Sequence, residues 1–184
     1  MGQLAEELKT TYHDILALGE SNQRIELFDG ECVMSAMPTL LHQQIATNLA
    51  SELLRHVKTR RLGIVLGSPV DVVLSEVIVL QPDVSFISNS RLDISDGRKL
   101  NAAPDLVVEI LSESTEERDR TFKFREYAKG GAKEYWLVSP ENREIEVYRN
   151  SPKGFELLKT FRTSDIISSS LFPDASIPLK EIFP

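Results

Sequence analysis

The sequence predicts an α/β (α+β) fold in which a β-sheet is flanked by helices. The run LVVEIL, from Leu106 to Leu111, is apolar on both faces except at Glu109, which is typical of a strand in the middle of a sheet. A charged helix follows directly, from about Thr115 to Lys129, and a second apolar run, EYWLVSP, comes after it. Strand, helix and strand in this order indicate a sheet that helices cover.

Composition indicates one globular domain, spanning residues 1–184. The chain is 41% hydrophobic and 27% charged, which is enough apolar material for a single core. Its one cysteine, Cys32, excludes an internal disulfide and a cysteine-rich zinc site. No apolar run is long enough to span a membrane, and the start MGQLAEELKT lacks the apolar segment of a signal peptide. We therefore expect a cytoplasmic protein.

The first third of the chain predicts a short helix, a hairpin and a long helix. A helix is expected over Tyr12 to Leu18, and RIELFDGECVMS predicts a hairpin with its turn at Asp29-Gly30. Thr39 then opens a helix that ends near Gly63. Its apolar face comprises Leu41, Ile45, Ala46, Leu49, Ala50, Leu53 and Leu54. His42 shares this face, and both a packing role and a functional role remain open for it.

Several short strands come next, and they place two carboxylates near each other. The runs IVLG, VDVVL, VIVL and QPDVSFIS are strand candidates, with Asp83 at or just inside the mouth of the last one. Strand alternation puts Asp83 and Ser85 on one face of their strand, and Val107 and Glu109 on one face of theirs. If these strands are neighbours, Asp83 and Glu109 meet. A long polar loop, Arg91 to Ala103, joins them.

The helix after Glu109 has its own start and stop signals. Ser114 and Glu117 form a capping box, and Gly130-Gly131 ends the helix. Lys123 shares a face with Arg120 and Tyr127, so it can reach back toward the sheet. Downstream, Tyr135 and Trp136 are expected in the core, and EIEVYRN with FELLKTF predicts a C-terminal β-meander.

Glu109 is the strongest functional candidate that the pattern alone provides. A buried carboxylate without a partner costs several kcal/mol, so Glu109 needs a proton, a donor or a cation. A metal ion and a structural ion pair are both possible answers. Asp83 could likewise pair with an arginine or cap a turn, and Lys123 could be an ordinary surface lysine.

Net charge is −7, whereas nucleic-acid binders usually present a basic face. The basic residues are nevertheless bunched in two groups. These are Arg55, His56, Lys58, Arg60 and Arg61, and then Arg118, Arg120, Lys123, Arg125, Lys129 and Lys133. They are either solvated helix ends or a rim that contacts phosphates.

Six segments in order resemble the Uma-type family of restriction-endonuclease-like proteins, in the PD-(D/E)xK nuclease superfamily. They are RIELFDGE, P-T-x-x-H from Pro38 to His42, PDVSFI, PDLVVEILSEST, R-D-x-x-x-K-x-x-x-Y from Arg118 to Tyr127, and EYWLVSP. The resemblance covers nearly the whole chain. It implies a mixed β-sheet core with helices on both sides, built in the order helix, three strands, helix, strand.

The resemblance also implies a hydrolase, an endonuclease that cuts phosphodiester bonds of DNA with Mg²⁺ (or Mn²⁺). Asp83, Glu109 and the carbonyl of Ile110 would hold the metal, with Asp83, Glu109 and Lys123 as catalytic residues. The family pattern expects a lysine two residues after Glu109, where this chain has Leu111. Lys123 would replace it. Asp105, Ser112 and Asp119 flank the strand–helix junction, so we expect them to support the site or to cap the helix. His42 and Tyr127 are further candidates around the centre. From the second basic group, Arg118, Arg120 and Arg125 are expected to contact nucleic acid.

Double-strand cleavage would need two sites, and hence a symmetric homodimer. Two other functions stay open: a catalytically inactive nucleic-acid-binding or interaction module, which the acidic charge and Leu111 favour, and a two-carboxylate glycosidase, which the 7% aromatic content disfavours. A nuclease site requires Asp83 and Glu109 to approach within roughly 3 to 6 Å, with Lys123 about 4 to 8 Å from one of them.

Overall fold

The computed structural model describes residues 9–17, 19 and 24–184 of the chain. Residues 1–8, which begin the segment examined for a signal peptide, and Leu18, the last residue of the first predicted helix, lie outside the described part. The helical elements are α1 (Tyr12–Ala17), α2 (Leu40–Arg60), η1 (Asn89–Ile94), α3 (Glu116–Arg118), the π-turn η2 (Asp119–Lys123), α4 (Phe124–Lys129) and η3 (Leu179–Glu181). The strands are β1 (Ile25–Phe28), β2 (Glu31–Met34), β3 (Gly63–Gly67), β4 (Val72–Ser75), β5 (Ile78–Leu80), β6 (Val84–Ser88), β7 (Leu106–Ile110), β8 (Glu134–Ser139), β9 (Glu144–Ser151), β10 (Gly154–Arg162), β11 (Ile166–Ile167) and β12 (Ile177–Pro178).

A six-stranded mixed sheet forms the centre of the molecule, in the order β10-β9-β8-β7-β6-β3. β7 lies inside it, antiparallel to β6 and parallel to β8. All five residues of β7 are buried, Glu109 included, as the apolar run predicts. The α/β class, the mixed sheet and the C-terminal meander of β8, β9 and β10 are therefore confirmed.

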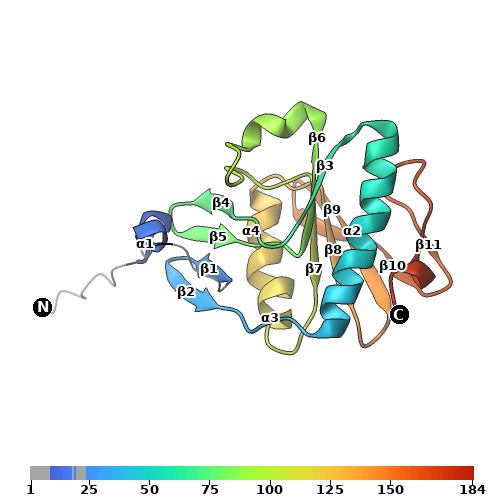
Figure 1. Ribbon diagram of the computed structural model, residues 1–184, viewed down its shortest axis with the longest axis horizontal. Coiled ribbons are helices and arrows are strands. Elements are labelled where there is room, and N and C mark those ends of the chain that lie inside the picture. Colours follow the sequence, from blue (N-terminus) through green and yellow to red (C-terminus); the bar gives the residue numbers. More distant parts are fainter. Residues whose placement is uncertain (1–8, 18, 20–23) are drawn as a thin grey trace, which may run out of the picture.

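The two faces of this sheet carry different layers (Figure 1). On one face α2 buries Ile45, Leu49, Leu53 and Val57 against the strands, together with the C-terminal segment around Phe172. The other face is covered by the α3–η2–α4 helical segment, with Tyr127 packed on Tyr135 and Val107. Alternation along β7 assigns Val108 to the first face, and Val107 and Glu109 to the second.

A second, four-stranded sheet, in the order β2-β1-β5-β4, lies beside the helical segment (Figure 1). The hairpin of β1 and β2 turns at Asp29 and Gly30, both with positive φ, as the Asp-Gly pair predicts. β5 pairs with β1 of this hairpin and β4 pairs with β5, so neither strand joins the central sheet. The sequence predicts these strands but not their separate sheet, since the partner of a strand is set by distant residues.

The predicted capping box at Ser114 is wrong. Thr115 occupies the N-cap position and makes no capping bond with its side chain, while Ser114 Oγ contacts Ser112 Oγ at 3.3 Å. The first helical amides are satisfied by a main-chain turn instead, because the N–H groups of Thr115 and Glu116 both donate to the Ser112 carbonyl. The end of the helix agrees with prediction: Gly130 caps it and Gly131 has φ +85°.

The C-terminal segment is anchored by a buried carboxylate at the start of β8. Glu134 is fully buried and accepts hydrogen bonds from the side chains of Trp136, Ser169 and Ser170 and from the main-chain N–H of Ser170. These bonds hold the chain that leaves β11 and continues into β12 and η3, whose apolar side chains pack on the α2 face. In the described part of the chain, no helix combines the length and apolar content needed to cross a membrane.

Replacing Gly63 with alanine should destabilise the fold through a backbone clash. A Cβ at Gly63 would lie 1.9 Å from the Ile87 carbonyl oxygen on the paired strand β6. Backbone cannot turn aside as a side chain can, so we expect the unfolding free energy to fall by about 1–3 kcal/mol. Urea denaturation measures this loss.

Gly67→Ala is the matched control, because Gly67 ends the same strand and a Cβ there meets nothing within 4 Å. We expect a change within about 0.5 kcal/mol for that variant. Equal losses at both positions would contradict the steric argument.

Candidate active site

Asp83 and Glu109 lie side by side at one end of the six-stranded sheet. β6 and β7 are antiparallel neighbours with Val84 opposite Val108, so the residue before Val84 meets the residue after Val108. The main-chain N–H of Asp83 donates to the Val108 carbonyl at 3.1 Å and extends this pairing. The predicted adjacency of the two strands is confirmed. Both carboxylates are buried.

Lys123 enters the same cluster from the helical segment. It belongs to the π-turn Asp119–Lys123, and its side chain is only 3% exposed. The ammonium group lies 3.2 Å from Glu109 Oε1, 3.2 Å from Asp119 Oδ1 and 3.0 Å from Glu26 Oε1. Single π-helical turns within α-helices, such as this one, recur at functional sites. This one brings Asp119 and Lys123 inward together, and Tyr135 Oη donates to the Asp119 carbonyl behind them.

The hairpin strand β1 supplies two residues that the sequence did not single out. Glu26 is 2% exposed and accepts a hydrogen bond from the Gln81 N–H at 2.8 Å. Arg24, just before the strand, donates from Nη1 to Asp83 Oδ1 at 2.8 Å and places Nη2 3.8 Å from Glu109 Oε2. Alternation in a hairpin predicts such charged residues on a solvent face. Apart from their place in the RIELFDGE segment, no local signal marks them.

His42 and Ile110 complete the surroundings of Asp83. His42, in the first turn of α2, places Nε2 3.2 Å from Asp83 Oδ2. The main-chain N–H of Ile110 donates to the same oxygen at 2.8 Å. The functional alternative for His42 is therefore supported by its position, since its ring contacts a buried carboxylate rather than apolar side chains alone. A metal-binding role for the Ile110 carbonyl stays a prediction.

Burial and ion pairing shift the acidities of this cluster in opposite directions. Burial raises the pKa of Glu109 well above 4.5, although Lys123 lowers it. Burial also raises the pKa of Asp119. For Asp83 burial acts in the same direction, but His42, Arg24 and the Ile110 N–H outweigh it and hold the pKa far below 3.8. Burial lowers the pKa of Lys123, yet its three carboxylates raise it overall, so the lysine stays charged.

The cluster holds more carboxyl groups than cations, so a further cation could take the place of the proton that burial favours on Glu109. Four carboxylates, from Glu26, Asp83, Glu109 and Asp119, face the two cations Arg24 and Lys123. Among residues 9–17, 19 and 24–184, no group of three His, Cys, Asp or Glu is arranged to hold a metal ion. Carboxylate oxygens are nevertheless the ligands that Mg²⁺ prefers. The donor chemistry therefore fits a hard divalent ion.

The remaining predicted site residues divide between the two ends of the sheet. Asp119 belongs to the cluster, and Tyr127 is buried beneath it. Ser112 lies in the turn before the helix, with Oγ 2.9 Å from Thr115 Oγ1. Asp105 is not brought to the cluster: it precedes β7 at the opposite end, where it pairs with Lys133 at 2.7 Å and Arg91 at 3.4 Å.

The three arginines predicted to contact nucleic acid differ in their availability. Arg120 is held by Glu116 and by a bidentate pair with Glu146. Arg125 pairs with Glu126 at 2.6 Å. Arg118 is exposed at the start of the helix and lies over the Phe28 ring, 5.5 Å from its centroid. Arg118 is therefore the best placed of the three to contact a phosphate.

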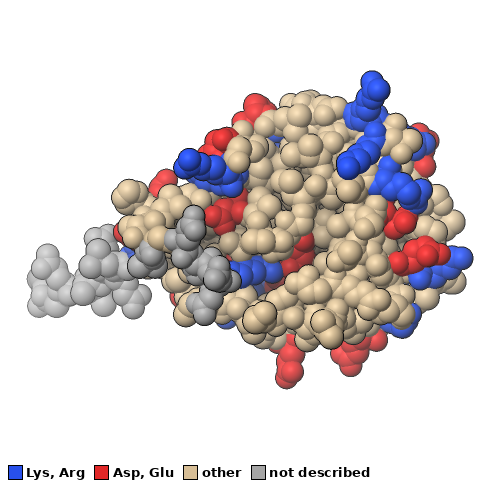
Figure 2. Space-filling model, in the orientation of Figure 1, with Lys and Arg blue, Asp and Glu red and all other residues tan. Residues whose placement is uncertain are grey.

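The first basic group lies away from the cluster. Lys58 and Arg60 are in the last turn of α2, and Figure 2 shows basic side chains gathered over that end of the helix. A rise of 1.5 Å per residue puts Lys58 about 24 Å along the helix from His42. The buried ring of His56 packs on Phe172. This group does not form a rim around Asp83 and Glu109. Acidic and basic atoms meet instead in the hollow between α2 and the hairpin side (Figure 2).

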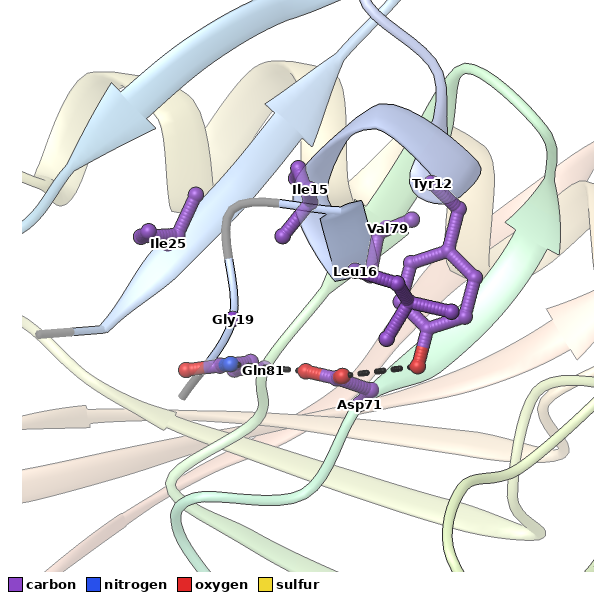
Figure 3. Close-up of a pocket in the computed structure, with 8 residues that line it drawn as sticks. All are labelled: Tyr12, Ile15, Leu16, Gly19, Ile25, Asp71, Val79 and Gln81. Carbon is purple, nitrogen blue, oxygen red and sulfur yellow. Dashed lines mark hydrogen bonds between the residues drawn. The ribbon is translucent and has the colours of Figure 1, made fainter. Parts of the chain in front are cut away.

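Two cavities lie outside the cluster. The first, of about 160 Å³, is bordered by α1 and β5, and in it Asp71 accepts hydrogen bonds from Tyr12 Oη and Gln81 Nε2 (Figure 3). It is smaller than ordinary ligand pockets. The second, of about 460 Å³, lies between α4 and the turn joining β9 to β10, with Arg125, Lys129 and Lys153 on its wall. Neither contains Asp83, Glu109 or Lys123.

Comparison with known proteins agrees with this architecture. A "putative nuclease" of the DUF820 group from Anabaena variabilis has a crystal structure that matches with a TM-score of 0.78, over 94% of this chain and 97% of its own. At 22% identity this likeness shows the fold. The mixed sheet with helices on both faces is thus shared with that protein.

The chain belongs to the Uma2 family, described as "Putative restriction endonuclease", whose model matches residues 10–180. An uncharacterized protein of Synechocystis sp. is 30% identical over 144 residues, which are 78% of this chain and 75% of that protein. The family predicted from the six sequence segments is therefore confirmed.

Glu109→Gln should remove a pH-dependent loss of stability from the metal-free protein. Folding raises the pKa of Glu109, so the folded protein holds the proton on this carboxyl group more tightly than the unfolded chain does. The stability that this proton contributes is fully present below pH 4.5 and is lost as pH rises through the raised pKa. Below pH 4.5 the two proteins should have similar unfolding free energies. Above it the wild type should lose up to about 1.4 kcal/mol per pH unit relative to Glu109→Gln. Urea denaturation with EDTA across pH measures this difference.

Glu156→Gln, on the exposed part of β10, is the control and should follow the wild type at every pH. If the curves of Glu109→Gln and the wild type run parallel throughout, Glu109 does not titrate as its burial requires.

Proposed function

We propose that the protein is a metal-dependent endonuclease that hydrolyses phosphodiester bonds of DNA, with Asp83, Glu109 and Lys123 as its catalytic residues. Membership of the Uma2 family supports the nuclease class. The observation that carries the proposal for this site is the convergence of the three side chains, Asp83 from just before β6, Glu109 from β7 and Lys123 from η2. Each is almost fully buried, and Glu26 and Asp119 add two further buried carboxyl groups beside them.

The carboxylates would hold Mg²⁺ or Mn²⁺ through Asp83 and Glu109, with the Ile110 carbonyl as a third ligand by family resemblance. When bound, such an ion would neutralise charge developing on the phosphate and lower the pKa of an attacking water. His42 and the Ile110 N–H orient Asp83 by binding its Oδ2, while Oδ1 accepts a hydrogen bond from Arg24.

Lys123 would supply the positive charge that family members carry two residues after the glutamate. Its ammonium group lies 3.2 Å from Glu109 Oε1, near enough to orient a water beside that carboxylate. Glu26 and Asp119 hold this ammonium group in place and keep it charged. Leu111, which stands at the usual lysine position, is 8% exposed and packs in the core.

A second candidate is an inactive nucleic-acid-binding module on the same fold. One observation favours it: Arg24 and Lys123 already pair with the carboxylates, so the cluster is partly neutralised by the protein itself. Cleavage of both DNA strands would need a second active site, and we propose a homodimer for that activity. A cytoplasmic location, which the exposed Cys32 suits, would give such an enzyme access to DNA.

Plasmid cleavage with calorimetric titration of Mn²⁺ tests the enzyme proposal. Asp83→Asn and Glu109→Gln should each abolish Mn²⁺ binding and cleavage, because each removes a ligand charge. Lys123→Met should keep Mn²⁺ binding but lose about 10²–10⁴-fold in cleavage rate, the usual range for a positioned proton-transfer group. EDTA should stop the wild-type reaction.

Two exposed residues provide controls: Asp174→Asn for the carboxylates and Lys129→Met for the lysine. Both should cleave at the wild-type rate. A wild type that binds DNA but cleaves neither plasmid nor single-stranded DNA, with Mg²⁺ or Mn²⁺, would favour the inactive module. Unchanged Mn²⁺ affinity in both carboxylate variants would eliminate the metal site.

Arg118→Ala should weaken DNA binding and make it less sensitive to salt. Each phosphate contact adds about 0.9 to the slope of log affinity against log salt for duplex DNA, and Arg118 is exposed at the start of the helix. Fluorescence anisotropy in the uncleaving Glu109→Gln background, with EDTA, gives the slope. Losing one contact should lower it by about 0.9.

Arg120→Ala should leave the slope unchanged, since Glu116 and Glu146 hold that guanidinium. Arg162→Ala, on the edge strand β10, is the exposed control. A slope unaffected by Arg118→Ala would place the DNA on another surface.

A further inference from the structure

The guanidinium of Arg24 stands between the two carboxylate oxygens that a metal ion would use. Asp83 Oδ2 is taken by the Ile110 N–H and by His42, and Glu109 Oε1 faces Lys123. The remaining oxygens are Asp83 Oδ1 and Glu109 Oε2. Arg24 Nη1 lies 2.8 Å from the first, and Nη2 lies 3.8 Å from the second.

Arg24 neutralises these carboxylates while making few hydrogen bonds to them. Its Nη1 group binds Asp83, but Nη2 is 3.8 Å from Glu109 and 3.9 Å from Glu26, beyond hydrogen-bond range. Its Nε is buried and finds no acceptor in the described part of the chain. Among the described residues the attraction is therefore mainly electrostatic, and another cation could replace it there with the loss of one hydrogen bond.

Lys123 is more deeply buried than Arg24 and has closer carboxylate partners. Its ammonium group lies within 3.2 Å of carboxylates from three elements, and its side chain is 3% exposed. The Arg24 side chain is 24% exposed. Of the two cations in the cluster, Arg24 is the one that can leave toward solvent. A divalent ion on the same two oxygens would also repel a guanidinium held at that distance.

We propose that Arg24 is the resident counter-ion of the metal-free site, and that a divalent cation binds by displacing its guanidinium from Asp83 and Glu109. The inference rests on the proposed metal site and adds a competition to it. Arg24 then lowers metal affinity while it stabilises the metal-free protein.

Calorimetric titration with Mn²⁺ tests the competition without measuring activity. Arg24→Met and Arg24→Ala should bind Mn²⁺ more tightly than the wild type, by about 5- to 150-fold, the usual range for coupling between two ligands. Adding methylguanidinium to Arg24→Ala should weaken Mn²⁺ binding again. Tetramethylammonium, a cation without N–H groups, should not. Arg55→Met, an exposed arginine on α2, is the matched control and should keep wild-type affinity.

A second measurement uses the unmutated protein. In protein labelled with ¹⁵N-arginine, the Nε–H signal of Arg24, assigned by its loss in Arg24→Met, should shift on adding Mg²⁺.

Before the titrations, each variant is treated with chelator and checked for cooperative thermal unfolding, so that a change in Mn²⁺ affinity is not mistaken for loss of the fold.

If the wild type binds Mn²⁺ and Arg24→Met binds it equally or more weakly, the competition is overturned while the metal site stands. An Arg24 signal that stays in place as calorimetry records binding overturns it as well. If neither protein binds Mn²⁺, the metal site and the competition fall together.

Discussion

The burial of four carboxylates with two cations is the constraint on which the candidate site depends. An uncompensated ion in a protein interior costs several kcal/mol, so every member of the cluster needs its partners in place. Those partners come from β1, β6, β7 and the π-turn. The hairpin must therefore dock against the helical segment for Lys123 to meet Glu26. The ion pair between Lys123 and Glu26 thus links the four-stranded sheet to the helical segment that covers the central sheet.

Much of this site follows from local patterns in the sequence. Glu109 stands out because it interrupts an apolar strand, and strand alternation brings Asp83 to the same face of the neighbouring strand. Lys123 follows from helical spacing, which turns it toward the sheet. Each of these patterns involves only a few neighbouring residues, so it can be recognised without knowing how the rest of the chain folds. The same holds for the Asp29-Gly30 turn and for Thr39 at the start of α2.

Other parts depend on contacts between distant segments, which local patterns do not record. Arg24 and Glu26 alternate with apolar residues in a hairpin, a pattern that ordinarily marks a solvent face. Glu26 is buried and Arg24 is half-buried because β1 pairs with β5, more than fifty residues later in sequence. The C-terminal segment packs on α2 for a similar reason, through Glu134. At Ser114 a local motif is present, but a main-chain turn from Ser112 meets the same need.

The two ends of the central sheet differ in how completely their charges are matched. At the end where β7 and β8 begin, Glu134 is surrounded by donors, and Asp105 is held by Lys133, Arg91 and the Ser88 N–H. At the other end lie the unbalanced carboxylates. The contacts that anchor the C-terminal segment and the candidate active site therefore lie at opposite ends of the same strands. Substitutions that change the charges of the cluster would therefore leave untouched the contacts of Glu134 and Asp105 at the opposite end of the strands.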